Sequence, residues 1–413
     1  MQKAGALYIH IPFCVQKCSY CDFCSEPIGN YDAERFVRAL CAEIRQRNDE
    51  FGMVDSLFLG GGTPSLLSEA SIRSIMQCLK DVCIFSPDPE VTIEANPATL
   101  DEKRLRFLRE VGFNRMSIGI QSIHANELRV LGRIHDWAEA EAAVHDAGRA
   151  GFDNISVDAM YGIPGQDAGA WIETLRRLIE LKPVHISAYE LTAEPGTPLF
   201  AGVQSRRYEL PHEESIEEMF YCADEMLSAH GYEHYEISNY ALPGRRCRHN
   251  MTYWQRRPYA GLGPAAHSFN GLERSSNIDD IGRYISLIET AQSVAAETTV
   301  LSDDDIWKET VFLGLRTIDG VCRAALSAEI WTAMEKALQN ERLQGLVVTD
   351  AGSLRLTQRG RLLSNEVIAT ILSGIEKHLR AQSAAAHPDS CRFDSPPARN
   401  RPAQQQPFGL SQE

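Results

Sequence analysis

The feature that most constrains the fold of this chain is a regular alternation of strand-like and helix-like segments in its first half. Short apolar segments predict six strands, at residues 7–11, 54–59, 90–95, 115–120, 152–160 and 185–189. Amphipathic segments between them predict helices at residues 33–48, 69–81, 101–111, 124–131 and 168–180. Strands that alternate with helices of about 10–15 residues form βαβ units around a parallel sheet, either open or closed into a barrel. The sequence therefore predicts an α/β fold with six units, fewer than the eight of a complete TIM barrel.

The alternation weakens after about residue 205, which predicts a change in organisation there. We expect residues 1–205 to form the barrel, 206–300 an extension, 301–379 a helical domain and 380–413 a disordered tail. Helices combined with a short strand pair at residues 346–349 and 353–357 are typical of a winged-helix module. The tail is rich in Ala, Gln, Ser and Pro, and such a composition buries too little apolar surface to fold.

The charge and the hydropathy of the chain exclude two classes of partner. A net charge of −15 argues against nucleic-acid binding, which requires Lys and Arg to neutralise phosphates. No run of about 18 apolar residues is present, so no membrane span is expected. The first residues lead directly into a predicted strand and lack the long apolar region of a secretory signal. We therefore expect a cytoplasmic protein.

Four of the 11 cysteines lie between positions 14 and 24. In a reducing compartment such clustering indicates metal binding or catalysis rather than disulfides. Cys14, Cys18 and Cys21 can hold three irons of a 4Fe-4S cluster, which leaves the fourth iron open to a small molecule. Two other interpretations remain open. One is a structural zinc site that includes Cys24, although no Cys or His pair follows at finger spacing, and the other is a ferredoxin-type cluster with Cys24 as fourth ligand.

Glycine and polar residues follow the predicted strands, at the carboxyl ends where parallel α/β folds place their functional loops. The turn at residues 60–64 contains three glycines, whose backbone can approach a ligand closely and offer it N–H groups. Glu94 and Asp158 end two later strands, Gln121 follows another, and Arg133 lies in the next connection. Each alone fits a solvated polar group, but their succession indicates a joint ligand site.

Together these stretches resemble the oxygen-independent coproporphyrinogen III oxidase family of radical S-adenosylmethionine (SAM) proteins, and within it the haem-chaperone branch. The resemblance covers about residues 6–375 and includes Tyr8-Ile-His-Ile-Pro-Phe-Cys14, Tyr235-Glu-Ile-Ser-Asn239 and residues 261–268 and 313–317. It implies a partial (β/α)6 barrel followed by a small helical, winged-helix-like domain. It also implies a 4Fe-4S cluster on Cys14, Cys18 and Cys21. The contacts to SAM that it implies are Tyr8, Tyr20, Gly61, Gly62, Thr63, Glu94, Gln121, Arg133 and Asp158.

Three features favour the haem-chaperone branch over the oxidases. The oxidase branch has a fourth cysteine where this chain has Phe23, and it has a long segment ahead of the cluster where this chain has 13 residues before Cys14. His249-Asn-Met-Thr-Tyr253-Trp254 resembles the H-N-x-x-Y-W signature of the chaperone branch. The resemblance implies haem as bound cargo, with His249 as a candidate iron ligand and the neighbouring arginines as candidate partners of its propionates. A hydrogen-bonded histidine in an aromatic-rich loop, beside an exposed basic segment, fits the same residues.

We therefore expect a haem chaperone that carries a 4Fe-4S cluster and SAM and delivers haem to respiratory membrane enzymes, transiently at the inner membrane surface. We expect no coproporphyrinogen oxidase activity, and a homodimer is compatible with the sequence. The enzymatic alternative is the oxidase itself, which decarboxylates propionates by radical chemistry. A third alternative is another radical SAM activity on an unrelated substrate.

Overall fold

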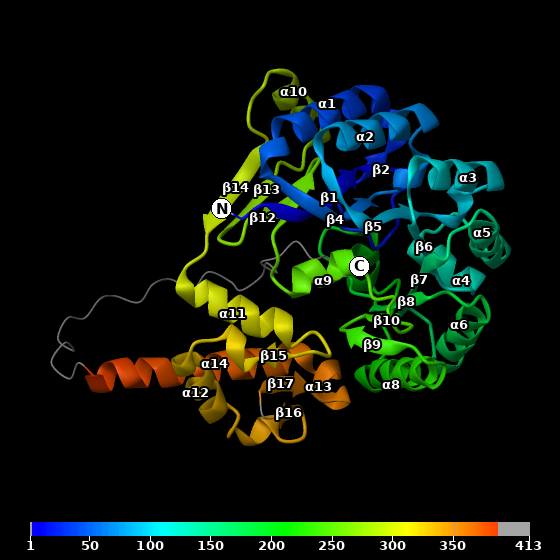
Figure 1. The fold of residues 1–413 in the computed structure, drawn as a ribbon. Coiled ribbons are helices and arrows are strands. Elements are labelled where there is room, and N and C mark those ends of the chain that lie inside the picture. The colour runs from blue at the N-terminus through cyan, green and yellow to red at the C-terminus, as the bar shows by residue number, and fades with distance from the viewer. Residues whose placement is uncertain (1, 351, 387–413) are drawn as a thin grey trace. The chain divides into compact units, whose positions relative to one another are not determined.

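The computed structural model describes residues 2–350 and 352–386, which form two compact units (Figure 1). The first contains the chain up to Tyr253 together with Arg257–Val300, and the second contains Trp254–Arg256 and the residues from Leu301 onward. The finer boundary at residue 205 stays a prediction. No helix within the described ranges is long and apolar enough to cross a bilayer.

One sheet of 12 strands organises the first unit, in the order β14-β13-β12-β11-β1-β4-β5-β6-β7-β8-β10-β9. Its parallel centre follows chain order, so each strand lies beside its predecessor, as βαβ crossovers require. All six predicted strands are present, and their arrangement confirms the predicted α/β partial barrel. They are β1 (Ala4–Ile11), β4 (Phe51–Gly61), β5 (Ile84–Ala95), β6 (Arg115–Gln121), β7 (Asn154–Tyr161) and β8 (His185–Glu190).

Amphipathic helices connect these strands, and all but the short helix that ends at Leu131 bury their apolar faces in the same core. Asp32, Ser68, Asp101 and Asp167 each accept a backbone N–H at the start of a helix, which satisfies a donor that has no partner inside the helix. The helices are α1 (Ala33–Gln46), α2 (Glu69–Val82), α3 (Glu102–Val111), α4 (Ala125–Leu131), α5 (Trp137–Arg149) and α6 (Ala168–Glu180).

The sequence predicts one helix between β6 and β7, whereas the structure has two. Gly132 ends α4 in the left-handed conformation, with φ +72°. Asp136 and Glu139 then form a capping box that starts α5. The buried face of α5 consists of Ala140, Ala143, Val144 and Ala147. These small side chains gave too weak an apolar pattern to predict the helix.

Short strands that the sequence does not predict widen the sheet at both ends. β11 (Tyr259–Leu262) pairs parallel with β1, and β12 (His267–Phe269), β13 (Glu273–Asn277) and β14 (Ala295–Val300) continue the sheet antiparallel. At the other end, β10 (Asn239–Ala241) pairs antiparallel with β8, and β9 (Glu233–Glu236) pairs antiparallel with β10. The helices of this part are α7 (Pro198–Gln204), α8 (Glu213–Ala229), α9 (Arg248–Trp254) and α10 (Ile281–Glu289).

The second unit is mainly helical and has its own apolar core, which includes Trp307, Trp331 and Ile371. It contains α11 (Asp303–Gly314), α12 (Ala328–Ala337), α13 (Gln358–Leu362) and α14 (Ser364–Ala386). The predicted strand pair is β16 (Val347–Asp350) with β17 (Ser353–Leu356), and β15 (Val321–Cys322) adds a third strand.

The last helix extends past the boundary that the sequence predicts. A disordered tail is expected from residue 380, but α14 continues to Ala386. The stretch after Arg380 is rich in alanine, the strongest helix former, which explains the extension. The remainder of the expected tail, residues 387–413, lies outside the described residues.

Candidate metal centre and ligand site

The loop that carries Cys14, Cys18 and Cys21 follows β1, at the carboxyl end of the parallel strands. Two short strands close its base, because β2 (Phe13–Cys14) pairs with β3 (Glu26–Pro27). The backbone N–H of Glu26 also donates to the carbonyl of Pro12 at 2.9 Å. We name residues 14–25 the cysteine loop. Its closed base keeps the three thiols in one small region.

Ser19 attaches the middle of the cysteine loop to two helices. Its N–H donates to the carbonyl of Leu131 at 3.0 Å, and its hydroxyl donates to the carbonyl of Val130 at 2.6 Å. Its own carbonyl accepts the N–H of Leu199 at 2.8 Å. A Cβ added to Gly132 would lie 3.1 Å from the Ser19 nitrogen, so the end of α4 leaves little room for a side chain there.

The three thiols form no disulfide, and each contacts a polar side chain. Thr63 Oγ1 donates to Cys14 Sγ at 3.8 Å, and Arg133 Nη1 donates to Cys18 Sγ at 3.5 Å. Cys21 Sγ lies 3.9 Å from the hydroxyl oxygen of Ser25. These contacts line one side of the cysteine loop with groups that can hydrogen-bond sulfur.

Burial raises the pKa of the Cys14 thiol, and it raises that of Cys21 to about 11. Metal binding at these positions must therefore displace protons. Across the described ranges, no three His, Cys, Asp or Glu side chains converge on the position of a single ion. In an iron–sulfur cluster each thiolate binds a different iron, so the ligands need not converge on one point. The donor set fits such a cluster better than one zinc ion.

Gly61 is enclosed by the side chains around it. It has φ +105°, and a Cβ there would collide with the ring of His10. Its N–H donates to Glu94 Oε2 at 3.0 Å, so the carboxylate at the end of β5 holds this turn. Only glycine satisfies both the backbone conformation and the close packing.

The next two residues of the turn bind the start of the cysteine loop. The Gly62 N–H donates to the carbonyl of Ile11 at 2.8 Å, and the Thr63 N–H donates to that of Phe13 at 2.7 Å. A Cβ on Gly62 would lie 2.5 Å from the carbonyl oxygen of Phe13. The sequence predicts that this turn offers N–H groups to a ligand. The structure corrects that prediction, because these N–H groups already donate within the protein.

Gln121 combines a strained backbone with a buried amide. It ends β6 with φ +70°, a conformation that costs a non-glycine residue about 1–3 kcal/mol, beside a register shift in the ladder to β7. Its side chain is 7% exposed, and among the described residues its Oε1 has no hydrogen-bond partner. An unsatisfied buried acceptor on a strained backbone fits the binding of a polar ligand.

Arg133 connects the cysteine loop with β6. Its Nη2 donates to the carbonyl of Gly119 at 2.5 Å, while Nη1 contacts Cys18, and the side chain also hydrogen-bonds Tyr20. Its Nε finds no acceptor within the described part of the chain. Burial raises the pKa of Tyr20, so its hydroxyl stays protonated at neutral pH. The structure therefore brings Tyr20, Arg133 and Cys18 together.

Asp158 lies inside β7, which continues past it to Tyr161, close to the predicted strand end at residue 160. Its carboxylate accepts hydrogen bonds from Ser117 Oγ at 3.1 Å and Ser187 Oγ at 2.7 Å, on the two neighbouring strands. Burial raises the pKa of Asp158, while these serine hydroxyls and nearby arginines act against the rise.

His10 is a residue of the site that the sequence analysis missed. Its Nδ1 accepts the hydroxyl of Tyr8 at 3.1 Å, and its Nε2 donates to the carbonyl of Cys24 at 2.8 Å. Burial lowers the pKa of His10 to about 4, so the ring is neutral. Residues two apart on a strand share a face, so its position after Tyr8 was the signal that could have identified it.

His249 lies on α9 and is 1% exposed. Its Nδ1 is 3.0 Å from Ser56 Oγ, its Nε2 is 2.8 Å from Tyr253 OH, and its ring stacks on Phe58. Burial lowers the pKa of His249 to about 3, so the imidazole is neutral. Both ring nitrogens of the candidate haem ligand are thus engaged within the protein.

Glu90, on β5, holds the start of α9. Its carboxylate accepts the N–H groups of Arg248 at 3.1 Å and His249 at 3.0 Å, and the Cys247 thiol at 3.6 Å. A carboxylate there satisfies helix N–H groups and the positive end of the helix dipole. The arginines expected near haem propionates also have protein partners: Arg245 pairs with Asp153, Arg246 with Glu233, Arg248 with Asp88 and Arg256 with Glu309, and Arg257 donates to Thr252.

Comparisons with known proteins give both sequence and structural relatives. Residues 8–178 match the Radical SAM superfamily, and residues 301–363 match the HemN C-terminal domain. The chain is 34% identical over 372 residues to the protein named "Heme chaperone HemW" of Bacillus subtilis (strain 168), covering 88% of this chain and 98% of that protein. It is 33% identical over 385 residues to the protein of the same name from Haemophilus influenzae, covering 89% and 98%. The coproporphyrinogen III oxidase HemN of Escherichia coli superposes with a TM-score of 0.78 at 25% identity, covering 91% of each chain.

Proposed function

The chain belongs to the radical SAM superfamily and, within it, to the family of heme chaperones named HemW, and from this membership we propose that it binds haem and passes it to respiratory membrane enzymes. We propose a cytoplasmic location, with transient contact at the inner membrane surface during transfer. One observation supports the proposed binding of the cluster and SAM: Arg133 hydrogen-bonds Cys18 of the cysteine loop, and Gln121 offers an unsatisfied buried acceptor.

Cys14, Cys18 and Cys21 would hold a 4Fe-4S cluster, which supplies an electron for cleavage of the SAM sulfonium when it is bound. The described residues support this role because the loop base is closed and Ser19 fixes its middle. Arg133 would stabilise the thiolate of Cys18 by its hydrogen bond.

The amino and carboxylate groups of SAM would bind near Gln121 and Arg133, which offer an unsatisfied oxygen and an unsatisfied N–H within the described residues. Glu94 would position the glycine turn through Gly61, and the carbonyl groups of the turn would act as acceptors for the SAM amino group. A Gln121→Leu variant tests this assignment by equilibrium dialysis with SAM. It should bind about tenfold less tightly, the loss of roughly one hydrogen bond, with little change in thermal stability.

A second candidate function is that of the oxidase, favoured by the superposition with HemN over 91% of each chain. We rank it second because Phe23 stands where the oxidases have a cysteine. Lys17 holds the backbone at Phe23, because its Nζ donates to the Phe23 carbonyl at 2.8 Å.

Binding of haem by His249 would require its Nε2 to exchange the Tyr253 hydroxyl for iron. Neutral imidazole is the form that binds iron, and the lowered pKa of His249 favours that form. The ligation itself stays a prediction.

One experiment separates the candidates. Protein reconstituted with iron and sulfide under anoxia is titrated with haem, then assayed with SAM and a reductant for deoxyadenosine and protoporphyrinogen. We expect stoichiometric haem binding without protoporphyrinogen. Sustained protoporphyrinogen formation would establish the oxidase, and an intact cluster without haem binding would refute the chaperone proposal.

A further inference from the structure

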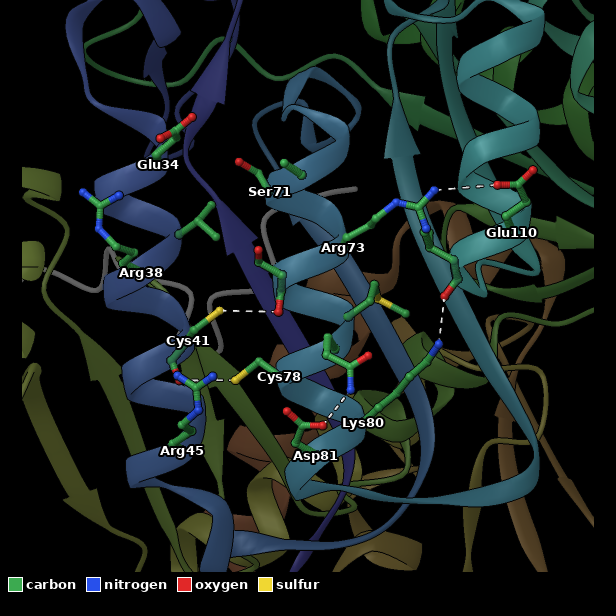
Figure 2. A pocket seen from close by; sticks show the side chains of 16 residues that line it. Glu34, Arg38, Cys41, Arg45, Ser71, Arg73, Cys78, Lys80, Asp81 and Glu110 are labelled. Carbon is green, nitrogen blue, oxygen red and sulfur yellow. Dashed lines mark hydrogen bonds and ion pairs between the residues drawn. The ribbon is translucent and has the colours of Figure 1, made fainter.

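Two cysteines outside the cysteine loop face each other between helices α1 and α2. Cys41 lies on α1, the first helix after the cysteine loop, and Cys78 lies on α2, the first helix after the glycine turn. Figure 2 shows their sulfur atoms between the two helices. Both side chains line a groove of about 880 Å³ on this side of the barrel.

Each of the two thiols contacts the backbone of the other helix. Cys78 Sγ donates to the backbone carbonyl of Cys41 at 3.4 Å, and Cys41 Sγ donates to the carbonyl of Ser74 at 3.7 Å (Figure 2). The two thiols also influence each other's charge, because each shifts the pKa of the other. The Cys78 sulfur thus lies in contact with the Cys41 backbone, and close approach of the two residues is what a disulfide requires.

The surroundings make the pair chemically asymmetric. The hydrogen bond from Cys41 lowers the pKa of Cys78 to about 7, and Arg45 acts in the same direction. The same contact raises the pKa of Cys41. When Cys78 loses its proton it no longer donates to the Cys41 carbonyl, and the Cys41 thiol keeps its own proton by donating to Cys78 instead of to Ser74. A thiolate is the reactive form of cysteine, so Cys78 is the nucleophile of the pair.

We propose that Cys41 and Cys78 are a redox-sensitive site, in which a peroxide converts the two thiols reversibly into a disulfide that links α1 to α2. The Cys78 thiolate attacks one peroxide oxygen and breaks the O–O bond, which gives a sulfenic acid and, with one proton, water. The Cys41 sulfur then attacks the sulfenic sulfur and releases a second water as the S–S bond forms. Two thiols lose two hydrogens and two electrons, which reduce one hydrogen peroxide to two waters. A small dithiol reverses the step by exchange.

The groove provides access for so small an oxidant. Although Cys41 and Cys78 are only 6% and 1% exposed, both contribute to the wall of the groove. Arg38, Arg45 and Arg73 stand around it (Figure 2), and their charges favour the thiolate form of cysteine. A folded protein partner would not reach sulfur atoms so deeply placed, so a small peroxide is the oxidant that fits.

Each of the two helices follows a loop of the candidate metal centre. The cysteine loop leads into α1, and the turn at residues 60–64 leads into α2. Cys41 and Cys78 lie in the second half of each helix, so a disulfide would fix the separation of the helices there, beyond the ends at which the loops join them. The proposal does not depend on the haem function, because it rests on the thiol pair alone.

Peptide mapping tests the proposal on the intact protein. Trypsin cleaves after Arg38, Arg45, Arg73 and Lys80, so Cys41 and Cys78 fall on separate peptides, 39–45 and 74–80, each with one cysteine. After brief treatment with hydrogen peroxide and blocking of free thiols, mass spectrometry of the unreduced digest should find these two peptides joined. Dithiothreitol should separate them. Joining should be at least about tenfold faster in the folded protein than in urea, because packing holds the thiols together.

Cys83 is the matched comparison. Burial raises its pKa to about 11, and it lies five positions beyond Cys78 at the end of α2. Cys83→Ser should leave the 39–45 to 74–80 link unchanged, whereas Cys41→Ser should leave Cys78 as a sulfenic acid that dimedone traps. The proposal is overturned if Cys78 links mainly to Cys83, if the link forms as fast in urea, or if Cys78 resists peroxide in the folded protein.

Discussion

The rings of Tyr8 and His249 lie 6.4 Å apart, so the strand that leads into the cysteine loop contacts the helix that carries the candidate haem ligand. Tyr8 donates to His10, and His10 donates to the carbonyl of Cys24 at the end of the loop. A continuous set of side chains therefore joins α9 to the cysteine loop. A displacement of α9 would therefore act on the cysteine loop through Tyr8 and His10.

Replacement of Cys18 by Ala should abolish the iron–sulfur absorbance near about 400 nm after anaerobic reconstitution. Cys24→Ala is the control, since the Cys24 thiol donates to the carbonyl of Asp279 at 3.0 Å and is not assigned to the cluster. Absorbance spectra and iron content measure both variants. Loss of the band in Cys24→Ala would instead support the ferredoxin-type interpretation.

Gly61→Ala should destabilise the protein by about 2–4 kcal/mol, because the added Cβ meets the ring of His10 at a backbone φ of +105°. Gly148→Ala, within α5, is the control: nothing lies within 4 Å of its Cβ position, and alanine favours a helix. Urea unfolding should therefore show opposite signs for the two variants. Equal effects would contradict the close packing of the turn.

Acid should destabilise the fold through its buried histidines. Burial lowers the pKa of His10 to about 4 and of His249 to about 3, whereas an unfolded histidine titrates near about 6.5. Below about pH 6.5 the unfolded chain binds more protons, so stability is complete above this pH and falls as pH decreases towards about 4.

The variant His249→Gln should reduce this dependence by up to about 1.4 kcal/mol per pH unit. Urea unfolding at about pH 5 and about pH 7 measures the slope. The control variant is His145→Gln, at an exposed position on α5. An unaltered slope in His249→Gln would show that His249 is not buried as a neutral ring.

Tyr253→Phe should strengthen haem binding if His249 Nε2 is the iron ligand. The variant removes the hydroxyl that hydrogen-bonds Nε2 at 2.8 Å. Iron then no longer has to displace this hydrogen bond, which is worth roughly 1 kcal/mol, so the affinity for haem should rise about fivefold. Haem titration followed by absorbance measures the affinity. The gain in affinity from Tyr253→Phe should disappear when His249→Gln is added. If His249→Gln binds haem with an unchanged spectrum, the ligand lies elsewhere.

The central part of the fold was predictable because βα alternation produces a strong periodic pattern. The missed elements carry weak patterns for physical reasons. The buried face of α5 is built from residues such as Ala140 and Ala147, and β10 and β12 are three residues each. So short a strand takes its stability from pairing with neighbours, which the local sequence does not record.

The sequence proposes residues for the candidate site but does not reveal their hydrogen bonds. The sequence placed Gln121 at the end of a strand, yet the strained φ and the unsatisfied Oε1 emerge only from the folded backbone. It suggested N–H donors in the glycine turn, but Glu94 and the carbonyls of Ile11 and Phe13 accept them. Such pairings join residues far apart in the chain, so no local pattern reveals them.

Strand β5 carries two of the carboxylates described above, Glu90 beneath α9 and Glu94 beside the glycine turn. Four residues of strand span about 13 Å, and an even spacing directs both side chains to the same face. Deletion or insertion of a single residue between them would turn one carboxylate outward and release either α9 or the turn. Over evolutionary time this strand should accept changes of residue type more readily than changes of length.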